Sequence, residues 1–381
     1  MWFTVGGRRR YIGSGSIGVS IHIIGTSVED NGVTTPQTAP CRLSPERQAH
    51  YMGRVSVVIP TTARPDVLEV TLRAVSRQVS RDLIDEVIVS ENLGDASSRD
   101  ACDKFPELPI RFVLREPQLT WSLHAQTLLR EARSEFVAFC CDDDVWAPGH
   151  IATGVEALDA HQSAGSFFSA AATGESELSQ RMSTWCAPLL WLAAGSPPRM
   201  SQYVLDRRAM LAIGWMFCPF KWSTLIARSD VGAKAAEVLT REPIPYWADC
   251  DFELALSREA DVVFEPGIDM MYRQGSRYWE KLGYDPRERD ATFQASRVEV
   301  LEEAKSLDID LPAFWRAALT DLPPEIVEQT GWWFRGRFSM KELESYGFLE
   351  LLPPDPRRTL VHRVGGRLAR AWKVLKTGST D

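Results

Sequence analysis

Between residues 55 and 141, short apolar runs alternate with stretches of helical apolar spacing, and this rhythm constrains the fold more than any other feature of the chain. Four runs have the length and composition of buried strands: VSVVIP, DEVIVS, IRFVLRE and FVAFCC. Helical spacing marks residues 65–79, which open on a proline suited to a helix start, and residues 122–132. This alternation predicts right-handed βαβ units and a mainly parallel sheet with helices on its faces.

The rhythm changes after Pro148. A helix is predicted over residues 151–160, and a long, irregular, Trp-rich segment follows it. Further on, residues 219–230 contain a strand, residues 247–260 form a helix and residues 261–266 form a short strand. From about residue 286 the chain is predicted to be helical, with breaks at prolines.

Composition excludes several classes of protein. The 381 residues suit about two domains, and a hydrophobic share of 44% is ordinary for a globular protein. A net charge of −8 argues against a general nucleic-acid binder, although a local basic patch stays open. The seven cysteines form no CxxC pair, so we predict neither a zinc site nor a disulfide framework, and a reducing cytoplasm fits best. No run approaches the roughly 20 apolar residues of a membrane span.

Three consecutive aspartates, Asp142, Asp143 and Asp144, follow the last predicted strand of the alternating region. In open α/β sheets, ligands bind at the edge where parallel strands end. Carboxylates this close repel one another unless a cation lies between them, and oxygen ligands favour Mg²⁺ or Mn²⁺, which commonly hold phosphates. Taken alone, the triplet is explained better by a solvated acidic turn. The neighbouring motifs therefore decide between the two interpretations.

The order of these motifs resembles the family 2 glycosyltransferases of the GT-A fold. VSVVIPTTARPD is similar to the first strand and turn of that family, DEVIVSEN to its second strand, and CDDDVWAPGH to its metal-binding strand end. WADCDFELAL is similar to the acidic motif on the acceptor side, and MYRQGSRYW to the Tyr-Arg segment that closes the site. The resemblance covers roughly residues 53–282 and rests on the order and spacing of the motifs. It implies an α/β fold with a Rossmann-like, mixed, mainly parallel sheet flanked by helices, and a C-terminal helical appendage.

The chain is predicted to divide into four parts. Residues 1–51 are rich in Gly, Ser and Thr and show no sustained periodicity, so they are predicted to form a flexible N-terminal extension. The resemblance makes residues 52–150 the half that binds the nucleotide-sugar donor. Residues 151–285 form the acceptor-binding half, and residues 286–381 a helical region. Met52, just before the first strong strand, is a candidate start codon, which N-terminal sequencing of the native protein would test.

The implied activity is an inverting transfer of a sugar from a nucleotide-sugar to an acceptor hydroxyl, on a glycan or a lipid-linked cell-envelope precursor. A divalent ion, Mn²⁺ or Mg²⁺, stabilises the departing diphosphate as a Lewis acid. The resemblance assigns this ion to Asp142 and Asp144, with Asp144 favoured for direct ligation. It places the donor against Pro60, Thr61, Arg64, Glu91, Asn92, Asp142, Asp143 and Arg273. For Arg64 a surface charge, and for Asn92 a turn-stabilising role, stay open.

Asp249 matches the catalytic base of the family, which takes the proton of the acceptor hydroxyl. Its alternative is a helix N-cap, since aspartate is favoured there on its own account. Asp251 is the second candidate for the base. Trp247 and Trp279 are predicted near the acceptor, because flat aromatic faces suit sugar rings, although most tryptophans serve packing. Asp251 is predicted to lie there as well.

Three departures from the family pattern leave other functions open. Glu91 stands where the family has an aspartate that reads the base, His124–Gln126 stand in place of Ala-Arg-Asn, and Gln274 replaces a histidine. They motivate a degenerate nucleotide-sugar binding module without turnover. A sugar-phosphate nucleotidyltransferase is a further alternative, but the turn TTARP lacks the Gly-rich phosphate loop of that class.

The last predicted helix, residues 359–376, is basic and amphipathic. Such a helix binds anionic membrane surfaces, which predicts a cytoplasmic protein that is peripheral at the inner face of the membrane. Packing on the domain is the alternative. Its apolar face comprises Leu360, Val364, Leu368, Ala371, Trp372 and Leu375.

Deleting residues 357–381 is expected to abolish binding to anionic liposomes, because each basic residue near such a surface contributes about 1 kcal/mol. Co-sedimentation with vesicles of neutral and of anionic lipid measures this. Unchanged binding of the truncated chain to anionic vesicles would remove the membrane interpretation.

Overall fold

The computed structural model describes residues 2–5, 8–11, 53–92, 96–174, 181–182, 202–216, 220–241, 248–273, 286–321, 327, 334–335 and 338–353. Trp247, Gln274, Trp279 and the helix predicted over residues 359–376 lie outside the described residues. The side chain of Arg273 does too, although its backbone is described. The chain separates into two compact units, Met1–Leu307 and Asp308–Asp381.

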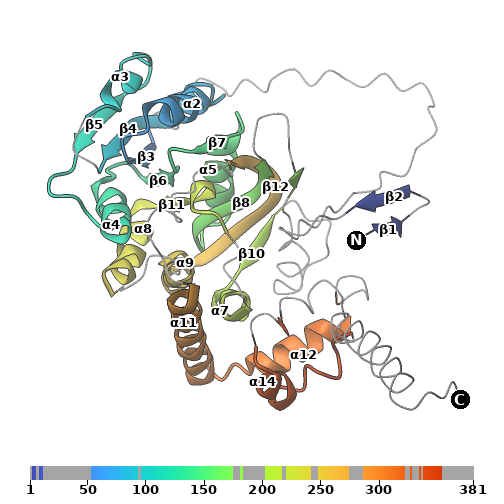
Figure 1. Ribbon diagram of the computed structural model, residues 1–381. Coiled ribbons are helices and arrows are strands. Elements are labelled where there is room, and N and C mark those ends of the chain that lie inside the picture. The colour runs from blue at the N-terminus through green and yellow to red at the C-terminus, as the bar shows by residue number, and fades with distance from the viewer. Residues whose placement is uncertain are drawn as a thin grey trace, which may run out of the picture. The chain divides into compact units, whose positions relative to one another are not determined.

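A large mixed sheet forms the centre of the first unit (Figure 1). Its strands are β3 (Val55–Thr61), β4 (Ile84–Glu91), β5 (Ile110–Leu114), β6 (Phe136–Phe139), β7 (Asp144–Trp146), β8 (Ala164–Gly174), β9 (Arg181–Met182), β10 (Tyr203–Leu205), β11 (Ile226–Arg228) and β12 (Asp261–Arg273). Eight of these follow the order β10-β12-β8-β11-β6-β3-β4-β5, while β7 pairs with β12 and β9 with β8. The described residues near the N-terminus add a separate antiparallel pair, β1 (Trp2–Val5) and β2 (Arg8–Tyr11).

The strands of this sheet are mixed in direction. β3 lies between β4 and β6 and is parallel to both, and β5 is parallel to β4. β11 is antiparallel to both β6 and β8. Beyond it, β12 is parallel to β8. The predicted α/β class with a mixed, mainly parallel sheet is therefore confirmed.

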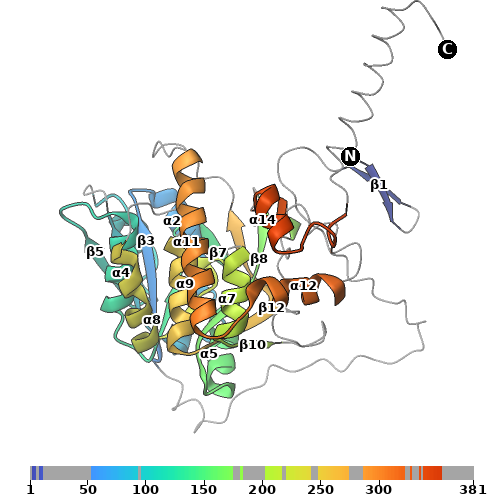
Figure 2. The same ribbon diagram turned by 90° about the horizontal axis from the view of Figure 1, so that it is seen from below.

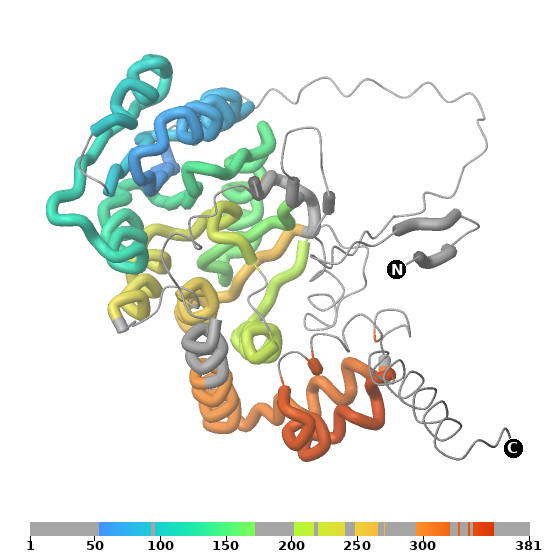
Figure 3. The backbone as a smooth tube through the Cα atoms, in the orientation of Figure 1, coloured from blue at the N-terminus to red at the C-terminus, as the bar shows by residue number. Residues whose placement is uncertain are grey.

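Helices cover the sheet on both faces (Figures 1 and 2). They are α2 (Pro65–Ser76), α3 (Arg99–Cys102), α4 (Trp121–Glu131), α5 (His150–Ala160), α7 (Arg207–Met216), α8 (Ser229–Ala235), α9 (Ala248–Glu259) and α11 (Pro286–Ser306), with the 3₁₀ turns η1 (Arg81–Leu83), η2 (Trp222–Thr224) and η3 (Ala236–Arg241). The backbone tube in Figure 3 follows the path from β3 through α2 to β4.

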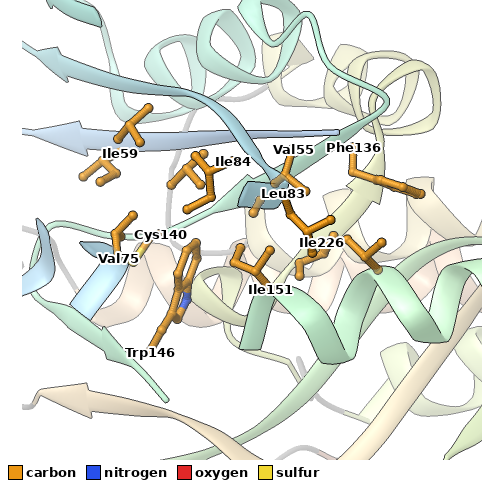
Figure 4. Close-up of a cluster of buried hydrophobic side chains, with 14 of the residues drawn as sticks. Val55, Ile59, Val75, Leu83, Ile84, Phe136, Cys140, Trp146, Ile151 and Ile226 are labelled. Carbon is orange, nitrogen blue, oxygen red and sulfur yellow. The ribbon is translucent and has the colours of Figure 1, made fainter. Parts of the chain in front are cut away.

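One buried cluster joins the strands to α2 and α5 (Figure 4). Alternate β3 residues Val55, Val57 and Ile59 point into it, and the apolar faces of α2 and α5 close it. All seven residues of β3 are buried, which explains why its sequence is a continuous apolar run rather than an alternating one. The edge where β3 ends is thereby held on a rigid base.

The structure corrects several predicted elements. α2 ends at Ser76, so Val79, predicted on its apolar face, is 72% exposed. The last strand extends over 13 residues, from Asp261 to Arg273, because register shifts beside Pro266 let the ladder continue past it. The segment predicted as irregular contains β8 and α7. The small residues of β8 have little strand preference, so its sequence did not predict a strand. At Gly165 a Cβ atom would lie 2.7 Å from the Ala260 Cβ, so close packing requires glycine there.

The second unit has its own aromatic core. Its described helices are α12 (Leu311–Asp321) and α14 (Met340–Ser345). Trp315 and Phe348 are fully buried and each makes an edge contact with Phe334. Ser339 begins α14 with a reciprocal capping box to Glu342. In the described part of the chain, no helix is both long and apolar enough to span a bilayer.

Candidate active site

Three parallel strands deliver polar residues to one edge of the sheet. β3 ends at Thr61, β4 ends at Glu91, and the acidic triplet follows β6. Because these strands are adjacent and parallel, their carboxyl ends meet. The Thr61 hydroxyl donates a hydrogen bond of 2.6 Å to Asp142 Oδ2, and the Asn92 backbone N–H donates to the Thr61 carbonyl at 3.0 Å. The predicted donor residues of the three strands are thus brought together.

Arg64 binds two of the three aspartates. Its Nε donates to Asp142 Oδ2 at 3.1 Å and its Nη1 to Asp143 Oδ2 at 3.3 Å, while Nη2 contacts Asp142 Oδ1. The preceding Ala63 has φ of 52°, a left-handed conformation that is costly for a residue with a Cβ and often marks functional turns. Arg64 therefore does not behave as a free surface charge in this structure.

Asp142 is almost fully buried and is held by Thr61 and Arg64. Burial raises the pKa of Asp142 to about 6, although the Arg64 guanidinium favours its charged form. Its carboxylate points toward the turn after β3, and both of its oxygens already accept hydrogen bonds.

Asp144 is positioned by residues that are distant in sequence. The Ser223 hydroxyl donates to Asp144 Oδ2 at 2.5 Å and accepts from the Cys141 N–H at 2.9 Å. The Thr71 hydroxyl on α2 lies 2.9 Å from the Asp144 carbonyl oxygen. In the β7–β12 ladder Asp144 is opposite Tyr272, so the backbone of Arg273 lies at the same edge.

A candidate metal cluster combines Asp143, Asp144 and Cys141. One ligand atom from each lies within 4.8 Å of the other two. The two carboxylates are the hard oxygen donors that Mn²⁺ and Mg²⁺ prefer, so this donor set fits such an ion. The cluster brings Asp143 together with Asp144; the pair predicted from the sequence, Asp142 and Asp144, stays a prediction. Burial and the adjacent Asp144 carboxylate raise the pKa of the Cys141 thiol well above its ordinary value.

Glu91 is fully buried at the end of β4. Its Oε2 accepts a 2.8 Å hydrogen bond from the Ser98 N–H. Its Oε1 has no hydrogen-bond partner among the described residues. A buried carboxylate oxygen without a donor costs free energy, which a ligand N–H or O–H would recover. Pro60, also buried, pairs with Ser90 beside Glu91 in the ladder.

Asn92 and the α4 residues that differ from the family pattern, His124 and Gln126, form hydrogen bonds within the fold. The Asn92 side chain exchanges two hydrogen bonds with the Leu119 backbone, at 2.8 and 2.9 Å, which favours its turn-stabilising role. His124 Nε2 lies 2.8 Å from Ser90 Oγ, and burial lowers the pKa of His124 to about 4. Gln126 donates to the Ala236 carbonyl at 2.9 Å. The unusual residues at these positions therefore have structural partners.

Asp249 lies in the first turn of α9 and is partly buried. Burial raises the pKa of Asp249 to about 7, and the charge of the Lys221 ammonium opposes that shift. Asp251, the second candidate, accepts a 3.0 Å hydrogen bond from Ser296 on α11. A carboxylate with a pKa near neutrality is suited to accept and release a proton during turnover.

The turn η2 links the acidic cluster to α9. Ser223 holds Asp144, the preceding Lys221 acts on Asp249, and the Trp222 ring packs against Phe252 of α9 with centroids 4.8 Å apart. The Ser223 carbonyl also accepts from the Trp146 indole N–H. Lys221 and Ser223 were not predicted as site residues; they lie in the segment 219–230, which was predicted only to contain a strand.

The sequence profile of the family described as Glycosyl transferase family 2 matches residues 56–214. This segment includes β3, β4, β6 and the acidic triplet, and it defines a glycosyltransferase, an enzyme that uses nucleotide-sugars. Over these residues the chain is similar to glycosyl transferase family 2. The match disfavours the nucleotidyltransferase alternative. Asp249 and Arg273 lie beyond the matched residues.

Two solved structures illustrate what the chain resembles. One is TarS 1-349 of S. aureus in complex with UDP-GlcNAc, with 14% identity, a TM-score of 0.44, and coverage of 72% of this chain and 83% of that chain. The other is the mannosyltransferase PcManGT from Pyrobaculum calidifontis in complex with GDP-Man and Mn²⁺, with 18% identity, a TM-score of 0.45, and coverage of 85% and 88%. Similarities this weak do not identify the donor or the metal of this chain. No curated protein sequence matches it significantly.

Proposed function

We propose that the protein transfers a sugar, with inversion of the anomeric centre, from a nucleotide-sugar to an acceptor hydroxyl. The observation that carries the proposal is the acidic edge of the sheet, where Asp143 and Asp144 lie together at the ends of the parallel strands. These two carboxylates would hold Mn²⁺ or Mg²⁺, which neutralises charge on the departing diphosphate when bound. The nucleotide would lie along the ends of β3 and β4.

Two residues are proposed to recognise the donor. Glu91 offers its unpartnered Oε1 to an N–H group of the base, which would satisfy a buried acceptor. Arg64 holds Asp142 and Asp143 and presents its guanidinium beside the proposed diphosphate site. Arg273, one residue beyond the partner of Asp144 in β12, is proposed as a second cation near the diphosphate.

Asp249 is proposed as the catalytic base. It accepts the proton of the acceptor hydroxyl while the acceptor oxygen attacks the anomeric carbon and the bond from that carbon to the diphosphate breaks. A pKa of about 7 leaves a large fraction of Asp249 ionised at neutral pH while keeping it basic enough for the task. Inversion follows from a single displacement. Trp247, Asp251 and Trp279 remain proposed acceptor contacts.

The proposed acceptor is a glycan or a lipid-linked cell-envelope precursor. This proposal rests on the basic amphipathic sequence of residues 359–376, which would bring the enzyme to an anionic membrane surface. The proposed location is therefore the cytoplasm, peripheral at the inner membrane face.

A thermal-shift screen of nucleoside diphosphates, with and without Mn²⁺, tests the donor site. A ligand at 100 times its Kd stabilises the folded state by about 2.7 kcal/mol, so the correct base will raise the Tm by several degrees, and more with Mn²⁺. UDP, GDP, ADP and CDP form the panel, and Glu91→Gln is the matched variant. A Tm that no nucleotide changes in a metal-dependent way would contradict the proposed site.

The departures at Glu91, Gln126 and Gln274 motivated the alternative of a binding module without turnover, which the family match does not favour. Turnover separates the two. Binding of a nucleotide-sugar with neither its hydrolysis nor its transfer in the presence of Mn²⁺ would identify the module.

A further inference from the structure

The proposed metal site contains a sulfur atom as well as carboxylates. Cys141 precedes the aspartates directly, and its Sγ lies within 4.8 Å of a carboxylate oxygen of both Asp143 and Asp144. Two ligands of one ion, at about 2.3 Å for sulfur and about 2.0–2.2 Å for oxygen, are at most about 4.5 Å apart. All three atoms are therefore close to the separation that a single ion requires.

One hydroxyl contacts both residues, at the backbone of Cys141 and at the carboxylate of Asp144. Ser223 Oγ accepts from the Cys141 N–H at 2.9 Å and donates to Asp144 Oδ2 at 2.5 Å. The positions of residues 141 and 144 are thus coupled through η2. Groups that support metal ligands in this way orient them and strengthen binding.

The neighbouring thiol serves a different purpose. Cys140 is fully buried in the apolar cluster shared by β3, α2 and α5, and Figure 4 shows it between Val75 and Trp146. Cys141 is partly exposed and is not a member of that cluster. Of two adjacent cysteines, only the one beside the carboxylates lies within reach of an ion.

We propose that Cys141 is a sulfur ligand of the divalent ion, so that the site is a mixed sulfur–oxygen site that prefers thiophilic ions such as Co²⁺ and Zn²⁺ to Mg²⁺. Thiolate ligands select softer metals, and affinities for nitrogen, oxygen and sulfur sites rise from Mn²⁺ through Co²⁺ along the first transition row. On binding, a bond forms between sulfur and the ion, and the thiol proton passes to the solvent. The inference rests on the metal site of the proposed function.

Titration of the full-length chain with Co²⁺ tests this assignment, because sulfur-to-cobalt charge transfer gives an ultraviolet absorption band that oxygen ligands do not give. The wild type and Cys140→Ser are expected to show a band that saturates at one Co²⁺ per chain and disappears with a chelator. Cys141→Ser, which exchanges only sulfur for oxygen, is expected to lack the band and to bind Co²⁺ about tenfold more weakly or worse. Its Mg²⁺ affinity should stay unchanged.

A wild-type titration without the band, or a band that persists in Cys141→Ser, overturns the inference. Electron paramagnetic resonance of Mn²⁺ separates this failure from failure of the proposed function. Equal Mn²⁺ binding by the wild type and Cys141→Ser, with no sulfur band, would leave the carboxylate site intact and reject the sulfur ligand. Failure of every divalent ion to bind would reject both.

Discussion

Replacing Asp249 by asparagine is expected to lower the rate of sugar transfer by about 10³-fold, while the nucleotide still binds. The variant keeps the size of the side chain and removes only its capacity to take a proton. Steady-state transfer and nucleotide affinity, measured on the same preparation, check the two halves of the expectation. Asp230→Asn, an exposed aspartate in the first turn of α8, is the matched control, and Asp251→Asn tests the second candidate for the base.

The same substitution is expected to stabilise the fold. Burial raises the Asp249 pKa from 3.8 to about 7, so its ionisation opposes folding. The destabilisation of the fold by ionised Asp249 is absent below pH 4. It grows as the pH rises between the two pKa values and is complete above pH 7. We expect the free energy of unfolding of Asp249→Asn to exceed that of the wild type by about 2 kcal/mol at pH 8. This is less than the full pKa shift would give, because the Asp249 side chain keeps some exposure to solvent.

Calorimetry at pH 5 and pH 8 measures this difference, which should be smaller at the lower pH. The wild-type kcat/KM is expected to fall as the pH drops below about 7, because protonated Asp249 cannot act as a base. A variant that is less stable than the wild type at pH 8, together with a flat pH profile of transfer, would contradict the role given to Asp249.

Replacing Asp144 by asparagine is the second substitution expected to have a large effect on sugar transfer. Loss of a metal-binding carboxylate is expected to reduce transfer by about 10³-fold, since a bound ion supplies several kcal/mol of charge stabilisation. Asp143→Asn should behave similarly, because Asp143 and Asp144 share the cluster. Both variants should lose the Mn²⁺-dependent part of the nucleotide thermal shift.

Asp142→Asn distinguishes between the two candidate metal-binding pairs, Asp143 with Asp144 and Asp142 with Asp144. Asp142 is held by Thr61 and Arg64, so its amide variant should retain Mn²⁺ binding while weakening the Arg64 contact. Isothermal titration with Mn²⁺ compares the three variants. Loss of Mn²⁺ binding in Asp142→Asn but not in Asp143→Asn would support the pair predicted from the sequence, Asp142 and Asp144.

Local pattern was sufficient to predict the scaffold of this site. The runs that became β3, β4 and β6 are mainly apolar. All residues of β3 and β6 and the last five residues of β4 are buried, as that pattern requires. Parallel direction then brings Thr61, Glu91 and the acidic triplet to one edge. The long β8 strand was not predicted, because its alanines, serines and glycines have little intrinsic strand preference.

Side-chain direction within the triplet was beyond the reach of the sequence. The orientation of Asp142 depends on Thr61 and Arg64, which lie 81 and 78 positions away. That of Asp144 depends on Ser223, which is 79 positions away. Such contacts arise only when the sheet has formed, and no periodicity records them. The role of Asn92 likewise became apparent only from its pairing with Leu119 across a loop.

Release of nucleoside diphosphate from a panel of nucleotide-sugars, measured with Mn²⁺ and with a chelator, tests the central claim most directly. The wild type should release one diphosphate from its correct donor, only when the metal is present, and faster with an acceptor. Asp144→Asn and Asp249→Asn should release little or none. Release by Asp144→Asn at the wild-type rate, or equal release in the presence of a chelator, would contradict a metal-dependent transferase at this edge of the sheet.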